Sequence, residues 1–334
     1  MSSSTSDGIE RAIDFSYDAC WFACPKCSDR VLMTFEDRDR GESRTCRSGH
    51  DVSARTEHPA LTEPSDIATN PAEIERLVWY HTTTRMDWPP TDESSSAIAT
   101  HLGTFESAIE NMFRRMQNEG DADSQFYLHR VRVACPPAEV SPLGGELSDL
   151  GGNVKLRVLD DAGYRVMRYV NVFEHPGSVS LVVVPSVITH VQALAVPFSL
   201  NVEESAVSRE IFARHVAERD EVEGRRPSTE GISRLEYLKP RNPGTAPIVR
   251  AARACDRELW AAEDRYKQAM TEVHMPGVGY RTREKVLDAR KYCREEPAGA
   301  HEKFRLLAEL VQNPARTLAA VQAQPVREVG AKTR

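Results

Sequence analysis

The sequence predicts an α+β protein composed of a small zinc ribbon, a central mixed α+β domain and an α-helical C-terminal region. Three observations support this class. Four of the seven cysteines fall within the first 50 of the 334 residues. Strand-like and helical patterns alternate between residues 75 and 202, and beyond residue 202 the apolar residues recur only at helical spacing. A chain of this length favours two or three domains over a single core.

Residues 1–55 are predicted to form a zinc-ribbon-like module. Cys24-x-x-Cys27 and Cys46-x-x-x-His50 flank an interval that contains the strand-like run VLMTF. Two ligand pairs separated by a hairpin-length loop suit the tetrahedral coordination of a structural zinc ion. Cys20, four residues before Cys24, is an alternative to His50 as the fourth ligand. Four protein ligands leave no open position on the metal, so we expect no zinc catalysis.

Residues 56–74 are predicted to be a linker, because Pro, Thr and Ser are frequent and no periodicity is sustained; a short helix that begins at Pro71 would close it. Residues 75–202 are predicted to be a mixed domain. RLVWYHTT, QFYLHRVRVAC, YRVMRYVNVFE and SVSLVVVPSV are strand-like, and FESAIENMFRRMQ places its apolar residues on one face of a helix.

Residues 203–322 are predicted to be a helical region, with four or five amphipathic segments separated by Pro or Gly, and residues 323–334 a terminal tail. Either the central domain or a second copy of the chain would cover the apolar sides of these helices, so a homo-oligomer is one expectation.

Composition excludes several classes of protein. No stretch approaches the roughly 18 uncharged apolar residues of a membrane span, and the N-terminus lacks a basic segment followed by an apolar one. We therefore expect a cytoplasmic protein with no membrane partner. An odd number of cysteines, clustered locally, argues against a disulfide scaffold. The net charge is −11 over residues 1–202 and +4 over 203–334, which is weak support for a polyanion partner.

Three polar stretches of the central domain carry a resemblance. They are WYHTT at 79–83, HLGT at 101–104 and RYVNVFEHPGSVSLVVVPSVI from residue 168. Taken singly, each has a structural explanation, such as a helix N-cap or a polar turn. In this order they resemble the ADP-ribosyltransferase-like proteins of bacteria and their phages, over about residues 77–195. The chain departs from the commoner His-Gly-Thr tripeptide of that family, because Thr82 replaces the glycine.

The resemblance implies a fold, a substrate and a set of site residues. NAD would be the substrate, and the glutamate of the closing strand, Glu174, would stabilise the positive charge that grows on the ribose as nicotinamide departs. His81 would bind the ribose on the adenosine side. The remaining residues implied to line the NAD site are Thr82, Thr83, His101, Gly103, Thr104 and Ser180.

The function implied is NAD-dependent ADP-ribosyl transfer to a macromolecular acceptor, either protein or nucleic acid, or hydrolysis of NAD. Two alternatives stay open. The first is an NAD-dependent RNA 2′-phosphotransferase, which would use His81 and His101 as paired histidines but needs a basic groove. The second is a catalytically inactive, zinc-containing module that binds a protein or a nucleic acid, an alternative that the substitution at Thr82 keeps open.

Overall fold

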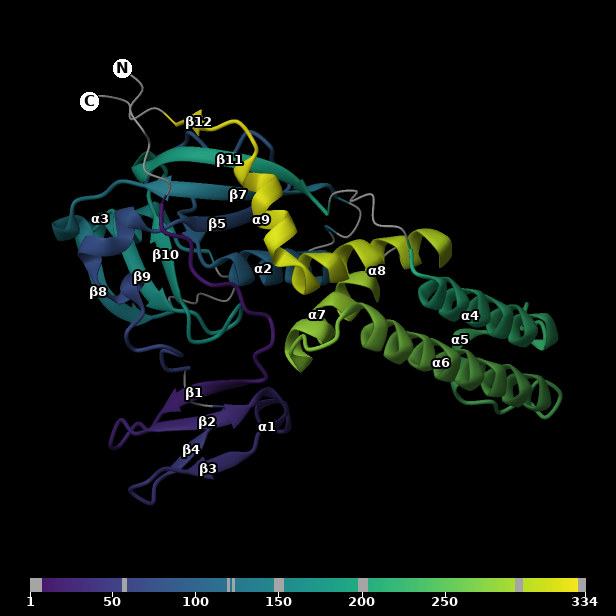
Figure 1. Cartoon of the computed structure of the whole chain (residues 1–334). Helices are drawn as coiled ribbons and strands as arrows, with labels where there is room; N and C mark the ends of the chain where they lie inside the picture. Colours follow the sequence, from purple (N-terminus) through teal and green to yellow (C-terminus); the bar gives the residue numbers. More distant parts are fainter. Residues whose placement is uncertain are drawn as a thin grey trace. The chain divides into compact units, whose positions relative to one another are not determined.

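Strands and helices are mixed along the chain in the computed structural model, which confirms the α+β class (Figure 1). The structure describes residues 8–55, 59–118, 121, 124–146, 153–197, 204–291 and 297–329. The chain divides into two compact units. The first contains residues 1–198, 277–294 and 309–334, and the second contains residues 199–276 and 295–308. Among the described residues, no helix combines the length and the apolar character that crossing a bilayer would require.

The N-terminal module consists of two hairpins and one short helix. Its elements are β1 (Ala19–Ala23), β2 (Arg30–Thr34), α1 (Phe35–Arg40), β3 (Ser43–Thr45) and β4 (Asp51–Ser53). β1 pairs with β2, and β3 with β4, both antiparallel. Thr34 and Asp37 form a capping box at the start of α1, and Gly41, with φ 68°, ends it. Cys20, Phe22, Met33, Phe35 and Val52 are among the residues of the small core.

Residues 59–74, expected to be part of a linker, belong to the first unit. Two 3₁₀ turns occur here, η1 (Ile67–Thr69) and η2 (Pro71–Arg76), and they bury Ala68 and Ile74. Pro71 begins η2, as the sequence predicts, because proline is suited to the first position of a helical turn and Asn70 caps it.

Two four-stranded sheets form the central part of the first unit. The order of the first sheet is β6-β10-β9-β8, from β6 (Thr100–Leu102), β8 (Val140–Gly145), β9 (Val166–Val170) and β10 (Val179–Val183). The order of the second is β12-β11-β7-β5, from β5 (Trp79–Thr83), β7 (Phe126–Val133), β11 (Ile188–Val196) and β12 (Arg327–Glu328). Figure 1 shows β11, β7 and β5 side by side. Two further 3₁₀ turns are η3 (Pro137–Glu139) and η4 (Pro185–Val187).

The apolar pattern of each element explains its place. All five residues of β10 are buried, as expected of an apolar run that is covered on both faces of its sheet. Helix α2 (Phe105–Asn118) buries Ile109, Met112 and Met116 on one face, as its sequence predicts. Helix α3 (Leu156–Ala162) precedes β9 and ends at Gly163 with φ 74°.

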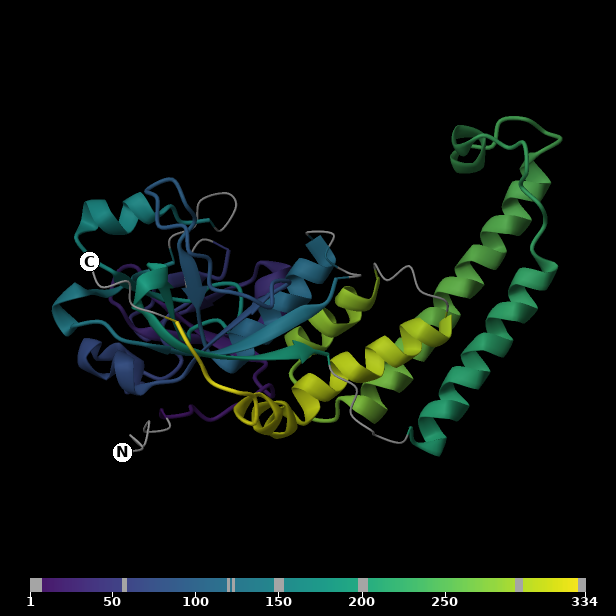
Figure 2. The same cartoon turned by 90° about the horizontal axis from the view of Figure 1, so that it is seen from above.

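The predicted helical region divides between the two units. The helices in or partly in the second unit are α4 (Ala206–Arg225), α5 (Arg234–Leu238), α6 (Ala246–His274) and α8 (Pro297–Gln312). Figure 2 shows α4 and α6 side by side. In contrast, α7 (Tyr280–Lys291) packs on α2, and α9 (Pro314–Gln322) packs on β7 and β11. The predicted tail contains β12, the edge strand of the second sheet, because its backbone pairs with β11.

Candidate functional site

Four side chains of the N-terminal module converge in a group that could hold a metal ion. Cys24, Cys27, Cys46 and His50 each offer a ligand atom, and these atoms lie within 4.8 Å of one another. Cys24 Sγ lies 3.7 Å from His50 Nδ1, and Cys27 Sγ lies 3.6 Å from Cys46 Sγ. A tight turn brings the two members of each pair together, since Ser28 N donates to the Cys24 carbonyl and Gly49 N donates to the Cys46 carbonyl. One imidazole nitrogen and three thiols in a cluster of this size suit a tetrahedral zinc ion.

Cys20 does not belong to this group. Its side chain is 1% exposed and lies in the core of the module, where it faces Met33 across the β1–β2 hairpin. Burial raises the pKa of the Cys20 thiol to about 11. Cys20 is therefore a small apolar core residue, and the structure brings His50 rather than Cys20 to the other three ligands.

In the central domain, β5 directs His81 and Thr82 to opposite faces of its sheet. Thr82 is completely buried, and its hydroxyl donates to the Ala108 carbonyl of α2 at 2.7 Å. Thr83 is buried as well, and its hydroxyl accepts a long hydrogen bond from Arg85 N at 3.4 Å. Thr82 thus faces the helix, which differs from the expectation that it lines a crevice with His81.

His81 is held by two neighbours. Its Nδ1 donates to the His101 carbonyl at 2.9 Å, and its ring stacks on Trp88 with the centroids 4.5 Å apart. Burial, together with the nearby His129, lowers the pKa of His81 to about 3. The ring is therefore neutral near pH 7. Because a carbonyl can only accept, Nδ1 carries the proton and Nε2 is an acceptor, the form suited to a sugar hydroxyl.

His101 connects this histidine to the first sheet. Its Nδ1 lies 3.1 Å from the Tyr169 hydroxyl, and the two rings meet edge to face. Burial raises the pKa of Tyr169 well above its ordinary value, and the negative charges of Glu146 and Glu174 add to the effect. Tyr169 pairs with Ser180 across β9 and β10, and its phenol lies close enough to Glu146 and Glu174 for their charges to act on it.

Glu174 lies in the turn between β9 and β10 and not on a strand as expected. The strand ends because Asn171 turns the chain: its Oδ1 accepts from Phe173 N and Glu174 N, and its Nδ2 donates to Ser180 Oγ at 3.0 Å. The Glu174 side chain is only 13% exposed and accepts from Arg114 Nε at 2.8 Å. Ser180 is buried and supports this turn.

A second carboxylate, that of Glu146, contacts the turn that bears Glu174. It accepts a hydrogen bond at 2.7 Å from the backbone nitrogen of Val172, a residue of that turn. Burial raises the pKa of Glu146 to about 7, with a further contribution from the charge of Glu174. Neighbouring carboxylates with such different surroundings are typical of acid–base pairs.

Gly103 and Thr104 start helix α2. Gly103 exchanges two backbone hydrogen bonds of 3.0 Å with Tyr80, and a Cβ at this position would meet Ser107 Oγ at 2.0 Å. The Thr104 hydroxyl accepts from Ser107 N and lies 2.9 Å from His175 Nδ1. Thr104 therefore contacts the residue that follows Glu174.

Of the residues that the resemblance singles out, His81 contacts His101, and Thr104 and Ser180 contact the turn of Glu174. His101 also contacts Tyr169, whereas Thr82 faces α2 instead. Sequence reasoning did not select Arg114, Glu146 or Trp88. Arg114 lies on the polar side of an amphipathic helix and Glu146 in an irregular polar segment, positions in which charged residues are ordinary. Nothing local distinguishes them.

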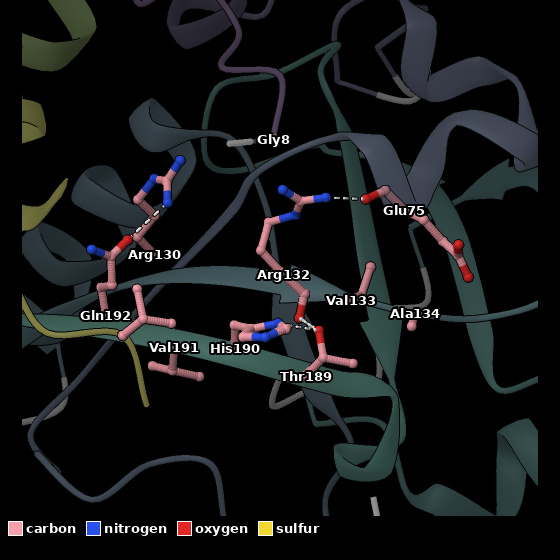
Figure 3. A pocket seen from close by; sticks show the side chains of 11 residues that line it. Gly8, Glu75, Arg130, Arg132, Val133, Ala134, Thr189, His190, Val191 and Gln192 are labelled. Carbon is pink, nitrogen blue, oxygen red and sulfur yellow. Dashed lines mark hydrogen bonds between the residues drawn. The ribbon is translucent and has the colours of Figure 1, made fainter. Parts of the chain in front are cut away.

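A cavity of about 340 Å³ lies elsewhere in the first unit (Figure 3). Arg130 and Arg132 of β7 line it, opposite Gln192 and His190 of β11. Arg130 donates to Gln192 Oε1 at 2.8 Å, and Arg132 to the Glu75 carbonyl at 2.7 Å. None of the predicted site residues lines this cavity.

Comparison with family models, with curated proteins and with solved structures finds no match to the chain.

Proposed function

We propose that the chain cleaves NAD between nicotinamide and ribose and transfers ADP-ribose to a macromolecular acceptor or to water. The observation that supports this proposal most strongly is the connected group of His81, His101, Tyr169 and the turn that bears Glu174 and contacts Glu146. It combines a neutral imidazole, a buried phenol and two carboxylates. These groups suit a sugar substrate that becomes cationic during the reaction.

Each residue has a role that its surroundings allow. As the bond to nicotinamide breaks, the ribose gains oxocarbenium character, and the Glu174 carboxylate would stabilise it through the ribose 2′-hydroxyl. Arg114 fixes the direction of that carboxylate. The Nε2 of His81 would accept from the ribose on the adenosine side, which orients the dinucleotide. Glu146, with a pKa of about 7, would take the proton of the acceptor nucleophile as it attacks.

We also propose that Cys24, Cys27, Cys46 and His50 bind a structural zinc ion. The ion would supply folding free energy to a module whose core contains few residues. With four protein ligands it would have no free position for a substrate, so the reaction is assigned to the central domain.

One observation favours a second candidate, a binding module without catalytic activity. Trp88 stacks on His81 with an interplanar angle of 18°, so one face of the imidazole is covered by the protein itself. The RNA 2′-phosphotransferase alternative is less favoured, because the charge of −11 over residues 1–202 does not suit a polyanion.

Release of nicotinamide from NAD, together with transfer of label from NAD to cell extract, tests the proposal. We expect activity in the wild-type chain and a loss of about a hundredfold or more in Glu174→Gln, because the substitution removes the charge that stabilises the transition state. Glu139→Gln is the matched control, since Glu139 is 41% exposed and pairs loosely with Arg165 at 3.7 Å. Equal activity in Glu174→Gln and wild type would refute the role of Glu174, and inactivity of the wild type would favour the binding module.

A further inference from the structure

Glu110 of α2 is a completely buried carboxylate with partners from three segments. Its Oε1 accepts from Thr282 of α7 at 2.9 Å and from the hydroxyl of Tyr17, and its Oε2 is paired with Lys285 Nζ. Burial alone would raise the pKa of Glu110, but the charge of Lys285 and the hydrogen bonds from Lys285, Tyr17 and the His175 amide together outweigh it and lower the pKa to about 2. Glu110 and Lys285 thus form an ion pair between α2 and α7, in which the carboxylate is fully buried and the lysine side chain is 17% exposed.

This ion pair holds the backbone on both sides of Glu174. Lys285 Nζ donates to the Phe173 carbonyl at 3.0 Å, and the His175 amide donates to Glu110 Oε2 at 2.8 Å. The chain of contacts runs from the carbonyl before Glu174, through Lys285 and Glu110, to the amide after it. A residue bracketed in this way has little freedom to change its backbone direction.

The conformation of His175 indicates that the turn needs such support. Its φ is 48°, in the left-handed region that residues other than glycine adopt at a cost. Thr104 contacts its Nδ1 at 2.9 Å, and the Tyr17 ring lies 5.0 Å from its imidazole, centroid to centroid. Strained backbone of this kind persists where the surrounding structure holds it, and it is concentrated at functional sites.

Arg281 adds a second donor from α7. It donates to the same Phe173 carbonyl at 2.9 Å, and its guanidinium lies 4.9 Å from the centre of the Phe35 ring. Helix α7 thus contacts both the N-terminal module and the turn of Glu174, although it lies more than 100 residues beyond that turn in sequence.

We propose that Glu110 and Lys285 are positioning residues for Glu174, so that helix α7 is a required part of the NAD site; the catalytic part of this inference rests on the proposed function. Neither side chain is assigned a contact with substrate. They act by fixing the peptide groups before and after Glu174, the residue whose carboxylate is proposed to contact the substrate.

The double variant Glu110→Gln/Lys285→Met tests this inference, because it removes both charges together and leaves no buried carboxylate unpaired. Hydrogen exchange followed by mass spectrometry reports on peptides that span residues 171–178. We expect exchange there to accelerate by about tenfold or more, while peptides of β7 and β11 keep their protection. In nicotinamide release we expect kcat to fall by about tenfold or more and KM for NAD to change by less than about threefold.

The matched control is Glu263→Gln/Lys267→Met, which makes the same two substitutions at a pair 4.0 Å apart on α6. Wild-type protection of residues 171–178 in the Glu110/Lys285 variant would overturn the inference, whatever the activity. If the wild-type chain releases no nicotinamide, the proposed function fails. The hydrogen-exchange result then still tests whether Glu110 and Lys285 hold the turn of Glu174. Should the double variant not fold, Lys285→Arg keeps the charge beside Glu110 while moving the donor, and unchanged exchange in that variant would equally overturn the inference.

Discussion

At the scale of single residues, burial and neighbouring charges determine what each group of the site can do. His81 has a pKa of about 3 and serves as a neutral hydrogen-bonding group. Glu146 has a pKa of about 7 and changes its protonation near neutral pH. Glu174 lies beside Arg114 in the same region. The division of work that we propose follows from these surroundings.

Glu146 makes stability depend on pH in a defined direction. Its folded-state pKa of about 7 exceeds its ordinary value of 4.5, so the folded chain binds this proton more strongly than the unfolded chain. The free energy of unfolding therefore falls as pH rises from 4.5 to about 7, by at most about 3 kcal/mol. Urea unfolding at pH 5 and pH 8 should show a smaller loss in Glu146→Gln than in wild type. An equal loss in both would contradict this assignment.

Thr82 illustrates a residue whose place sequence alone does not determine. We expect Thr82→Val to lower the free energy of unfolding by about 1 kcal/mol, because it removes the hydrogen bond to the Ala108 carbonyl. The rate of nicotinamide release should stay within about twofold of wild type, since the hydroxyl faces α2. Thermal unfolding and the NAD assay measure the two effects. A normal stability with a large loss of activity would show that Thr82 belongs to the site.

At the scale of elements, strands β5, β7, β9 and β10 and the apolar face of α2 could be predicted, because apolar and β-branched residues follow a local pattern in each. Strands β6, β8 and β11 lie outside the runs that the sequence marks as strand-like. The turn that bears Glu174 could not. YRVMRYVNVFE has the composition of one continuous strand, but Asn171 satisfies the amides of the next residues with its own side chain, and the strand stops at Val170.

Substitutions distinguish the residues that we propose as metal ligands from Cys20. Cys46→Ser should lose the bound metal and lower the thermal midpoint, because it removes one of the four proposed ligands. Cys20→Ala should keep the metal and lose only about 1 kcal/mol of stability, since Cys20 packs in the core. Elemental analysis of the purified chains gives the metal content, with about one zinc ion per wild-type chain expected. Loss of metal in Cys20→Ala with retention in Cys46→Ser would reverse the assignment.

At the scale of the whole molecule, the least predictable feature is which distant segments meet. Lys285 reaches Glu110 across 175 positions of sequence, and Gln192 reaches the Gln322 carbonyl across 130. Helical periodicity shows that a face is apolar but not what covers it, so the sequence does not separate α7 and α9 from the other C-terminal helices. The expected linker is a second case. Its polar composition gives no sign that residues 59–74 belong to the first unit and bury Ala68 and Ile74 there.

A crystal structure with a non-hydrolysable NAD analogue tests the central claim most directly. We predict that the nicotinamide ribose lies beside Glu174, with its 2′-hydroxyl within hydrogen-bond distance of the carboxylate, and that the adenosine ribose contacts His81. Occupancy only in the cavity lined by Arg130, Arg132 and His190, or no binding at all, would contradict the account.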